Sequence, residues 1–239
     1  MKDSILNGVI AGLIAGVILG ILTLTVITPL ILKAEVFESS VTVIKESASS
    51  HEHVNGEETP FFKRMLFTMV GTTTLGVSYG IVLSIVYLYL RNKGIKKGLI
   101  LGFFGFLFIN LLPGLGLPPN PPGIETIAEA RNRQLWWLLL ISAEIMGIGI
   151  FWFIHRTLRN SYKAVAAPAA ALISLVVISI PFILGSPSGI KYSLVPDEIV
   201  TIFRIASFAV AFIFWLFLGG FVAYFNKNLL KEEYGDVKL

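Results

Sequence analysis

Six long apolar stretches lie between Ile5 and Phe225 of this 239-residue chain, and short polar segments separate them. Each stretch has about 18 to 28 residues, and a helix of roughly 20 residues crosses the hydrocarbon core of a bilayer, which is about 30 Å thick. A helix also satisfies its backbone amide groups internally, as lipid requires. The sequence therefore predicts an all-α fold, a polytopic bundle of six transmembrane helices in a single membrane domain over residues 1–239.

The apolar pattern sets the positions of the predicted spans to within a few residues. They lie near 5–32, 65–90, 98–115, 135–154, 164–184 and 199–225. Pro113 and Gly114 interrupt the end of the third span, so a five-span alternative makes that segment re-entrant. The first stretch is longer than the apolar core of a signal peptide, and we expect it to be retained as a span. The predicted location is the cell membrane, with the lipid bilayer as the main partner.

Composition excludes several classes of function. Only 14% of the residues are charged, whereas a soluble domain has about 25%, and the net charge of +4 does not require a nucleic-acid partner. There are no cysteines, which excludes disulfides and thiol chemistry. We find no nucleotide-binding glycine loop and no catalytic Ser/His/Asp set. We therefore expect no enzymatic activity and no cofactor beyond a transient divalent metal.

Lysine and arginine counts predict the orientation of a membrane protein. Of the 19 such residues, eleven lie at the N-terminus, in the segments 91–97 and 155–163, and in the C-terminal tail, and eight lie on the other side. We therefore expect both termini to be cytoplasmic and the loops 33–64, 116–134 and 185–198 to lie outside. Acidic residues collect in these outer loops, which would attract cations. A plain solvated loop face is the alternative.

Glycines repeat every four residues along one face of the first span. They are Gly8, Gly12, Gly16 and Gly20. Small residues let helices approach closely in lipid, where association depends on packing. The pattern predicts that the first span is a tightly packed helix; the alternative is that this face binds a helix of a partner subunit.

The first outer loop contains the tripeptide His51-Glu52-His53, followed by Glu57 and Glu58. Imidazole and carboxylate groups bind divalent first-row metals, and residues i and i+2 lie on one side of an extended segment. So few ligands predict weak, exchangeable binding, typical of capture, that weakens below about pH 6.5, where free imidazole is protonated. An ordinary surface loop is the alternative.

Three polar residues inside the predicted spans are candidates for an ion path or a buried contact. Glu144 falls near the bilayer midplane, where a charged side chain costs about 2.5–3.5 kcal/mol. Such residues mark ion paths or buried pairs, and Arg204 is the candidate partner for a pair that only fixes packing. Asn110 is a second candidate for an ion path; the alternative is an interhelical hydrogen bond.

The second outer loop is rich in proline between Pro113 and Gly123. Pro118, Pro119, Pro121 and Pro122 hold it in a stiff, extended shape, and Pro113 is expected to end or kink the third span. The segment from Ile124 to Arg133 has apolar residues at helical spacing and is predicted to be a helix lying flat on the membrane. The loop forms either a shaped outer vestibule or a rigid connector.

Four blocks of sequence resemble the CbtA family, described as a proposed cobalt transporter subunit. The blocks are Pro29–Glu38; His51–His53; Pro113–Gly123 with Arg133–Trp137; and Val195–Glu198 with Ile205–Ser207 and Phe214–Gly219. The resemblance covers almost the whole chain, and the third block is the most specific. This chain differs from many relatives in its short histidine tract and in Asn110, which stands where relatives often have histidine, so its set of metal ligands is smaller.

The resemblance implies an integral membrane protein linked to cobalt supply for cobalamin synthesis. It also implies a small one-span partner subunit with a His-rich tail. The leading prediction is therefore transport of a divalent metal ion. The alternative is a structural or accessory subunit of a larger membrane complex, without transport activity of its own.

Overall fold

The computed structural model of the chain describes residues 2–46, 61–90, 94–158 and 163–234, without the side chains of 39–46, 163 and 227–234. In this part of the chain six helices are long and apolar enough to cross a membrane. The third of them, Ile95–Gly116, is 22 residues long, which favours six spans over five. The prediction of a helical membrane bundle is confirmed.

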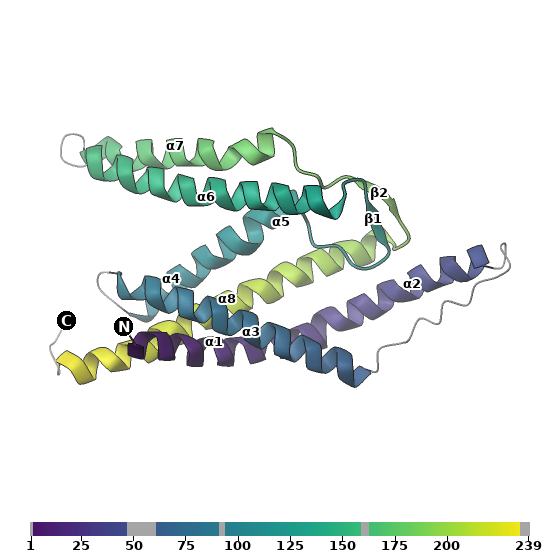
Figure 1. Cartoon of the computed structure of the whole chain (residues 1–239), viewed down its shortest axis with the longest axis horizontal. Coiled ribbons are helices and arrows are strands. Elements are labelled where there is room, and N and C mark those ends of the chain that lie inside the picture. Colours follow the sequence, from purple (N-terminus) through teal and green to yellow (C-terminus); the bar gives the residue numbers. More distant parts are fainter. Residues whose placement is uncertain (1, 47–60, 91–93, 159–162, 235–239) are drawn as a thin grey trace. The chain divides into compact units, whose positions relative to one another are not determined.

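The chain divides into two compact units (Figure 1). The first unit comprises Met1–Leu107, Asn120–Gly123 and Leu194–Leu239, and the second comprises Phe108–Pro119 and Ile124–Ser193. The short segment Asn120–Gly123 thus belongs to the first unit, although the residues on both sides of it belong to the second.

The first unit begins with one continuous helix. It consists of α1 (Lys2–Leu22), the π-helical turn η1 (Thr23–Ile27) and α2 (Thr28–Glu46). Pro29 lacks the N–H of a regular helix, and its ring would crowd the carbonyl four residues earlier. A π turn widens the helix just before the proline, and Thr28 Oγ1 donates a hydrogen bond to the Thr23 carbonyl at 3.1 Å. The helix therefore passes the proline without ending.

A π turn before a proline also occurs in the third membrane helix. This helix consists of α4 (Ile95–Phe106), the π turn η2 (Leu107–Leu111) and α5 (Leu112–Gly116), which contains Pro113. Pro113 was expected to end or kink this helix. It does not end the helix, because the chain stays helical to Gly116. The π turn again stands immediately before the residue that precedes the proline.

Helix α1 packs against α3 (Phe61–Leu88) along its glycine face. A Cβ atom added at Gly8, Gly12 or Gly16 would lie 2.6–2.9 Å from a backbone Cα atom of α3. A Cβ at Gly20 would meet the side chains of Met69 and Thr72 instead. The four glycines therefore face another helix of the same chain.

Glycines also allow α4 to pack closely against α8 (Asp197–Tyr234). A Cβ atom at Gly219 would lie 3.0 Å from Gly102 Cα, and one at Gly102 would meet the carbonyl of Trp215. Trp215 is 2% exposed, and its ring lies 5.0 Å from that of Tyr79. Close backbone contact and one large buried aromatic side chain thus hold α8 in the first unit.

Three buried polar side chains join α1, α3 and α8 in a closed hydrogen-bond network. Ser4 Oγ donates to Asn226 Oδ1 at 2.7 Å, and Ser84 Oγ donates to the Ser4 carbonyl at 2.6 Å. Asn226 Nδ2 donates to Ser84 Oγ at 2.9 Å and to the Val222 carbonyl at 2.8 Å. Every donor of the three side chains has an acceptor, so the network stabilises the bundle without an unsatisfied polar group.

The second unit contains the helical hairpin of α6 (Ala130–Leu158) and α7 (Lys163–Ile183), which pack together (Figure 1). Trp136 of α6 is 6% exposed, and its Nε1 donates to the Pro181 carbonyl at 3.0 Å. This carbonyl lies in the last turn of α7, where helical carbonyls lack backbone partners. The indole therefore caps the end of α7.

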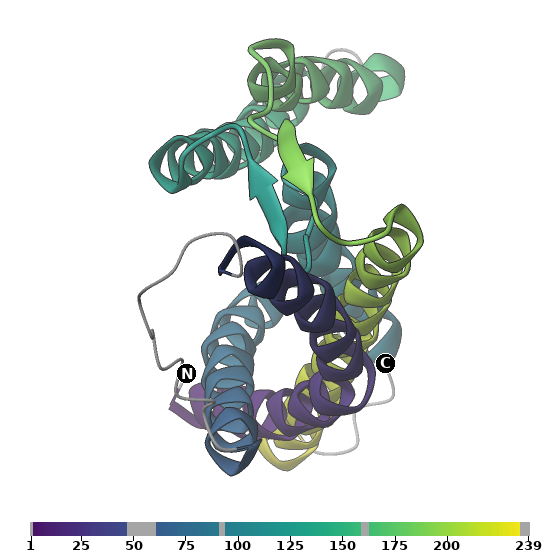
Figure 2. The ribbon, with the colours of Figure 1, turned by 90° about the vertical axis from the view of Figure 1, so that its right-hand side faces the viewer.

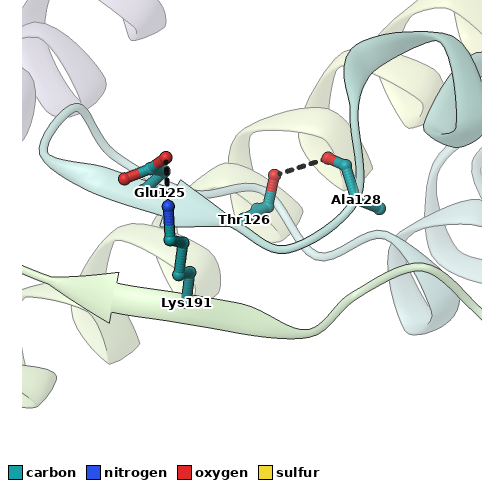
Figure 3. Close-up of polar contacts among 4 residues, drawn as sticks. All are labelled: Glu125, Thr126, Ala128 and Lys191. Carbon is teal, nitrogen blue, oxygen red and sulfur yellow. Dashed lines mark hydrogen bonds and ion pairs between the residues drawn. The ribbon is translucent and has the colours of Figure 1, made fainter.

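A short antiparallel ribbon completes the second unit (Figure 3). It pairs β1 (Ile124–Thr126) with β2 (Ile190–Ser193), and its register shifts between Glu125 and Thr126. Lys191 Nζ lies 3.3 Å from Glu125 Oε1, and Thr126 Oγ1 donates to the Ala128 carbonyl at 3.1 Å. The prediction of a flat helix from Ile124 is wrong, because strand pairing with a distant segment overrides the local apolar spacing.

The helices extend beyond several predicted spans. The first helix continues to Glu46, well into the segment 33–64 that was expected to be loop, and α8 continues to Tyr234. The apolar pattern marks the part of a helix that lies in lipid, whereas a polar helix continues into water without changing its backbone.

Candidate functional site

The predicted metal ligands His51, Glu52, His53, Glu57 and Glu58 lie outside the described residues, so their arrangement stays a prediction. The helices on either side of them are described: α2 ends at Glu46 and α3 begins at Phe61. Within the described ranges, no group of three or more His, Cys, Asp or Glu residues is placed to hold a metal ion.

An ion pair joins α2 to α3. Arg64 Nη2 lies 3.2 Å from Glu35 Oε1, and Arg64 Nη1 donates to Glu35 Oε2 at 3.3 Å. The two planar groups meet at two points, which fixes their orientation. Both side chains are about one-third exposed, so the pair is worth about 0–1 kcal/mol.

Gly123 brings three distant parts of the chain together in the first unit. Its φ of +82° favours glycine, and an added Cβ atom would lie 3.0 Å from Val195 Cγ2 and 3.6 Å from Glu38 Cβ. Its carbonyl accepts a hydrogen bond from the Leu194 N–H at 3.0 Å. The proline-rich segment, α2 and the residues that precede α8 thus meet at this residue. Helix α2 (purple) and the first turns of α8 (yellow-green) can be followed in Figure 2.

Arg204 of α8 holds the same proline-rich segment. Its Nη2 and Nε donate to Asn120 Oδ1 at 2.7 and 3.3 Å. Both side chains are half-buried, which strengthens hydrogen bonds to a charged group. The described partner of Arg204 is therefore an amide oxygen; Glu144 belongs to the other unit, and its predicted pairing with Arg204 stays a prediction.

Acidic side chains are exposed around this junction. Glu38 lies on α2, and Asp197 and Glu198 lie in the first turn of α8, where a negative charge complements the helix dipole. Asp197 and Glu198 stabilise the start of α8, and all three residues add negative charge to the surface formed by Gly123 and its neighbours. This surface is a candidate place for a cation to collect before it binds elsewhere.

Glu144 is buried in the second unit. It is 3% exposed and lies on the face of α6 that also buries Leu140, Ala143 and Gly147. That face meets α7, since a Cβ atom at Gly147 would lie 2.9 Å from Ile178 Cγ1. Among the described residues, Glu144 Oε1 has no hydrogen-bond partner. A carboxyl group in this position has an oxygen available for a proton or a cation.

Asn110, the other predicted path residue, lies in the π turn η2 and is half-buried. π turns are frequent at functional sites, because they displace a side chain and loosen the backbone hydrogen bonds. The sequence did not predict the π turn, although Pro113 three residues later was a usable signal.

The sequence interpretation also missed Asn120 as the partner of Arg204. It is the polar residue between two pairs of prolines, and a short amide side chain on a stiff segment was a signal for a specific contact. The pairing of Glu35 with Arg64 had no comparable signal, because it depends on how α2 and α3 diverge.

Comparison with known proteins identifies the family to which the chain belongs. No curated protein matches the chain, and no solved structure matches it. A family model described as "Probable cobalt transporter subunit (CbtA)" matches residues 1–227, and the chain therefore belongs to the CbtA family of multi-pass membrane proteins with a role in cobalt transport.

Proposed function

We propose that this chain takes up a divalent metal ion, cobalt, through the cell membrane for cobalamin synthesis. The observation that carries the proposal is the family match over residues 1–227. The six apolar helices are consistent with it, because a hydrated cation crosses a bilayer only along a path that protein provides. The link to cobalamin rests on the resemblance of the sequence blocks alone.

In this proposal the ion first meets the acidic surface around Gly123. Exposed carboxylates raise the local concentration of cations, and Glu38, Asp197 and Glu198 supply them. His51 and His53, with Glu52, Glu57 and Glu58 nearby in sequence, then bind the ion weakly enough to release it. In this proposal cobalt is the transported substrate.

Glu144 and Asn110, both in the second unit, are the candidate residues for the path through the membrane. A buried carboxylate without a complete set of partners is stabilised when a cation or proton arrives. Glu144 has one oxygen without a partner in the described part of the chain. The sequence contains no ATP-binding motif, so the energy must come from an ion gradient or from a partner subunit.

A second candidate function is that of an accessory subunit in a larger membrane complex. The family description favours it, because it says "subunit". The expected partner is a small one-span protein with a His-rich tail. In this case the chain would position the partner's metal-binding tail and conduct nothing itself.

Uptake of Co²⁺ and of Ni²⁺ into proteoliposomes, with and without the partner subunit, tests the proposal. The double variant His51→Ala with His53→Ala should raise the external Co²⁺ concentration needed for half-maximal uptake, and His155→Ala is the matched control. His155 stacks on Phe151 in the last turn of α6, with ring centroids 5.8 Å apart. Absence of uptake under all conditions, with copurification in a fixed ratio to another subunit, would instead establish the accessory function.

Glu144 is tested in the same assay. Glu144→Gln should abolish uptake if the carboxylate is part of the path, while the exposed carboxylate variant Glu129→Gln should leave uptake unchanged. Unchanged uptake together with a lower melting temperature would show that Glu144 serves packing only.

A further inference from the structure

A pocket of about 340 Å³ lies in the second unit, where α5 ends and α6 begins. Its walls are formed by Leu117, Ala130, Arg133, Gln134 and Trp137. The lining is therefore apolar in part and also carries a guanidinium and an amide. A pocket of this kind suits a ligand that has both a polar head and an apolar body.

Arg133 gives the pocket its charge. Its side chain is half-buried, and it has neither an ion-pair nor a hydrogen-bond partner among the described residues. Arg131, two residues earlier, is exposed and does not line the pocket. A partly buried guanidinium without an acceptor favours binding of an anion, and its planar donors match the oxygens of a phosphate.

The depth of the pocket identifies the source of such a phosphate. Helix α6 has 29 residues and is about 43 Å long, whereas the hydrocarbon core is about 30 Å thick. The apolar part of α6 begins at Leu135, so Arg133 and Gln134 lie at the level of the lipid headgroups. Trp137, 40% exposed, stands one turn deeper, as interfacial tryptophans do.

We propose that this pocket binds an anionic phospholipid. Arg133 would hold the phosphate and Gln134 would donate to the headgroup or the ester oxygens. Leu117 and Trp137 would contact the first part of an acyl chain. The site is separate from the proposed cation path, because a free arginine repels divalent cations, and the proposal does not depend on transport.

Native mass spectrometry of the purified full chain in detergent tests this. We expect the chain to retain phosphatidylglycerol in preference to phosphatidylcholine of the same chain length. Arg133→Gln should lower the retained phosphatidylglycerol by about fivefold, which corresponds to the contribution of one arginine near a lipid surface. Arg131→Gln removes the same charge outside the pocket, and we expect less than a twofold change.

The wild-type chain also provides a measurement that does not depend on the folding of a variant. Phosphatidylglycerol should raise its melting temperature more than phosphatidylcholine, and inorganic phosphate at millimolar concentration should have no effect. Equal losses in the two arginine variants, equal retention of both lipids, or displacement of the lipid by inorganic phosphate would each overturn the proposal.

Discussion

At the scale of single residues, the contact between Arg204 and Asn120 determines how the proline-rich segment is held. Asn120→Ala leaves the half-buried guanidinium without its described acceptor, which should lower the free energy of unfolding by about 1–3 kcal/mol. Asn120→Asp keeps the acceptor oxygen and adds a complementary charge, so its stability should equal or exceed that of the wild type. Denaturant titration in mixed micelles measures both effects.

Asn132→Ala is the control for this prediction, because Asn132 is exposed on α6 and should change stability by less than about 0.5 kcal/mol. Equal stability of Asn120→Ala and the wild type would show that the prolines alone hold the segment. This result would also remove the reason to regard Gly123 and its neighbours as a fixed surface.

At the scale of elements, the close packing of the α1 glycines against α3 decides whether the first unit assembles. Gly12→Ala places a Cβ atom against the Gly76 carbonyl and 2.6 Å from Val77 Cα. Backbone atoms cannot rotate away, so the helices must separate, at a cost of about 1–3 kcal/mol or more. Gly71→Ala in α3 is the matched control, because nothing lies within 4 Å of the added atom, and it should stabilise the helix by about 0.5–1 kcal/mol. Thermal unfolding in detergent compares the two.

The elements also show what the sequence does and does not predict. Six helices were predictable, because lipid thickness imposes a minimum length on every apolar span. The continuation of the first helix to Glu46 was not, because hydropathy reports the solvent around a helix and not its hydrogen bonds. The ribbon of β1 and β2 pairs Glu125 with Tyr192, and no local pattern reveals a partner so far away. The bonds of Arg204 and Glu35 depend on three-dimensional packing in the same way.

At the scale of the whole molecule, the proposed function requires that the histidine tract and the proline-rich loop lie outside the cell. The chain has no cysteine, so single cysteines introduced at chosen positions report their side of the membrane without background. A membrane-impermeant maleimide should label Ser50→Cys and Asn132→Cys in intact cells. It should label Asn92→Cys and Lys238→Cys only after permeabilisation.

Labelling at positions 50 and 132 also tests how many spans lie between Ser50 and Asn132. Two helices, α3 and the helix Ile95–Gly116, separate these positions, so both cysteines must react on the same face if each helix crosses the bilayer. A re-entrant third segment would place them on opposite faces, and an inverted orientation would place both in the cytosol. In the first case the histidine tract and the proline-rich loop would lie on opposite faces, and in the second both would lie in the cytosol. Either result would show that they do not share the outer face, and uptake from outside would no longer follow from the arrangement of the chain.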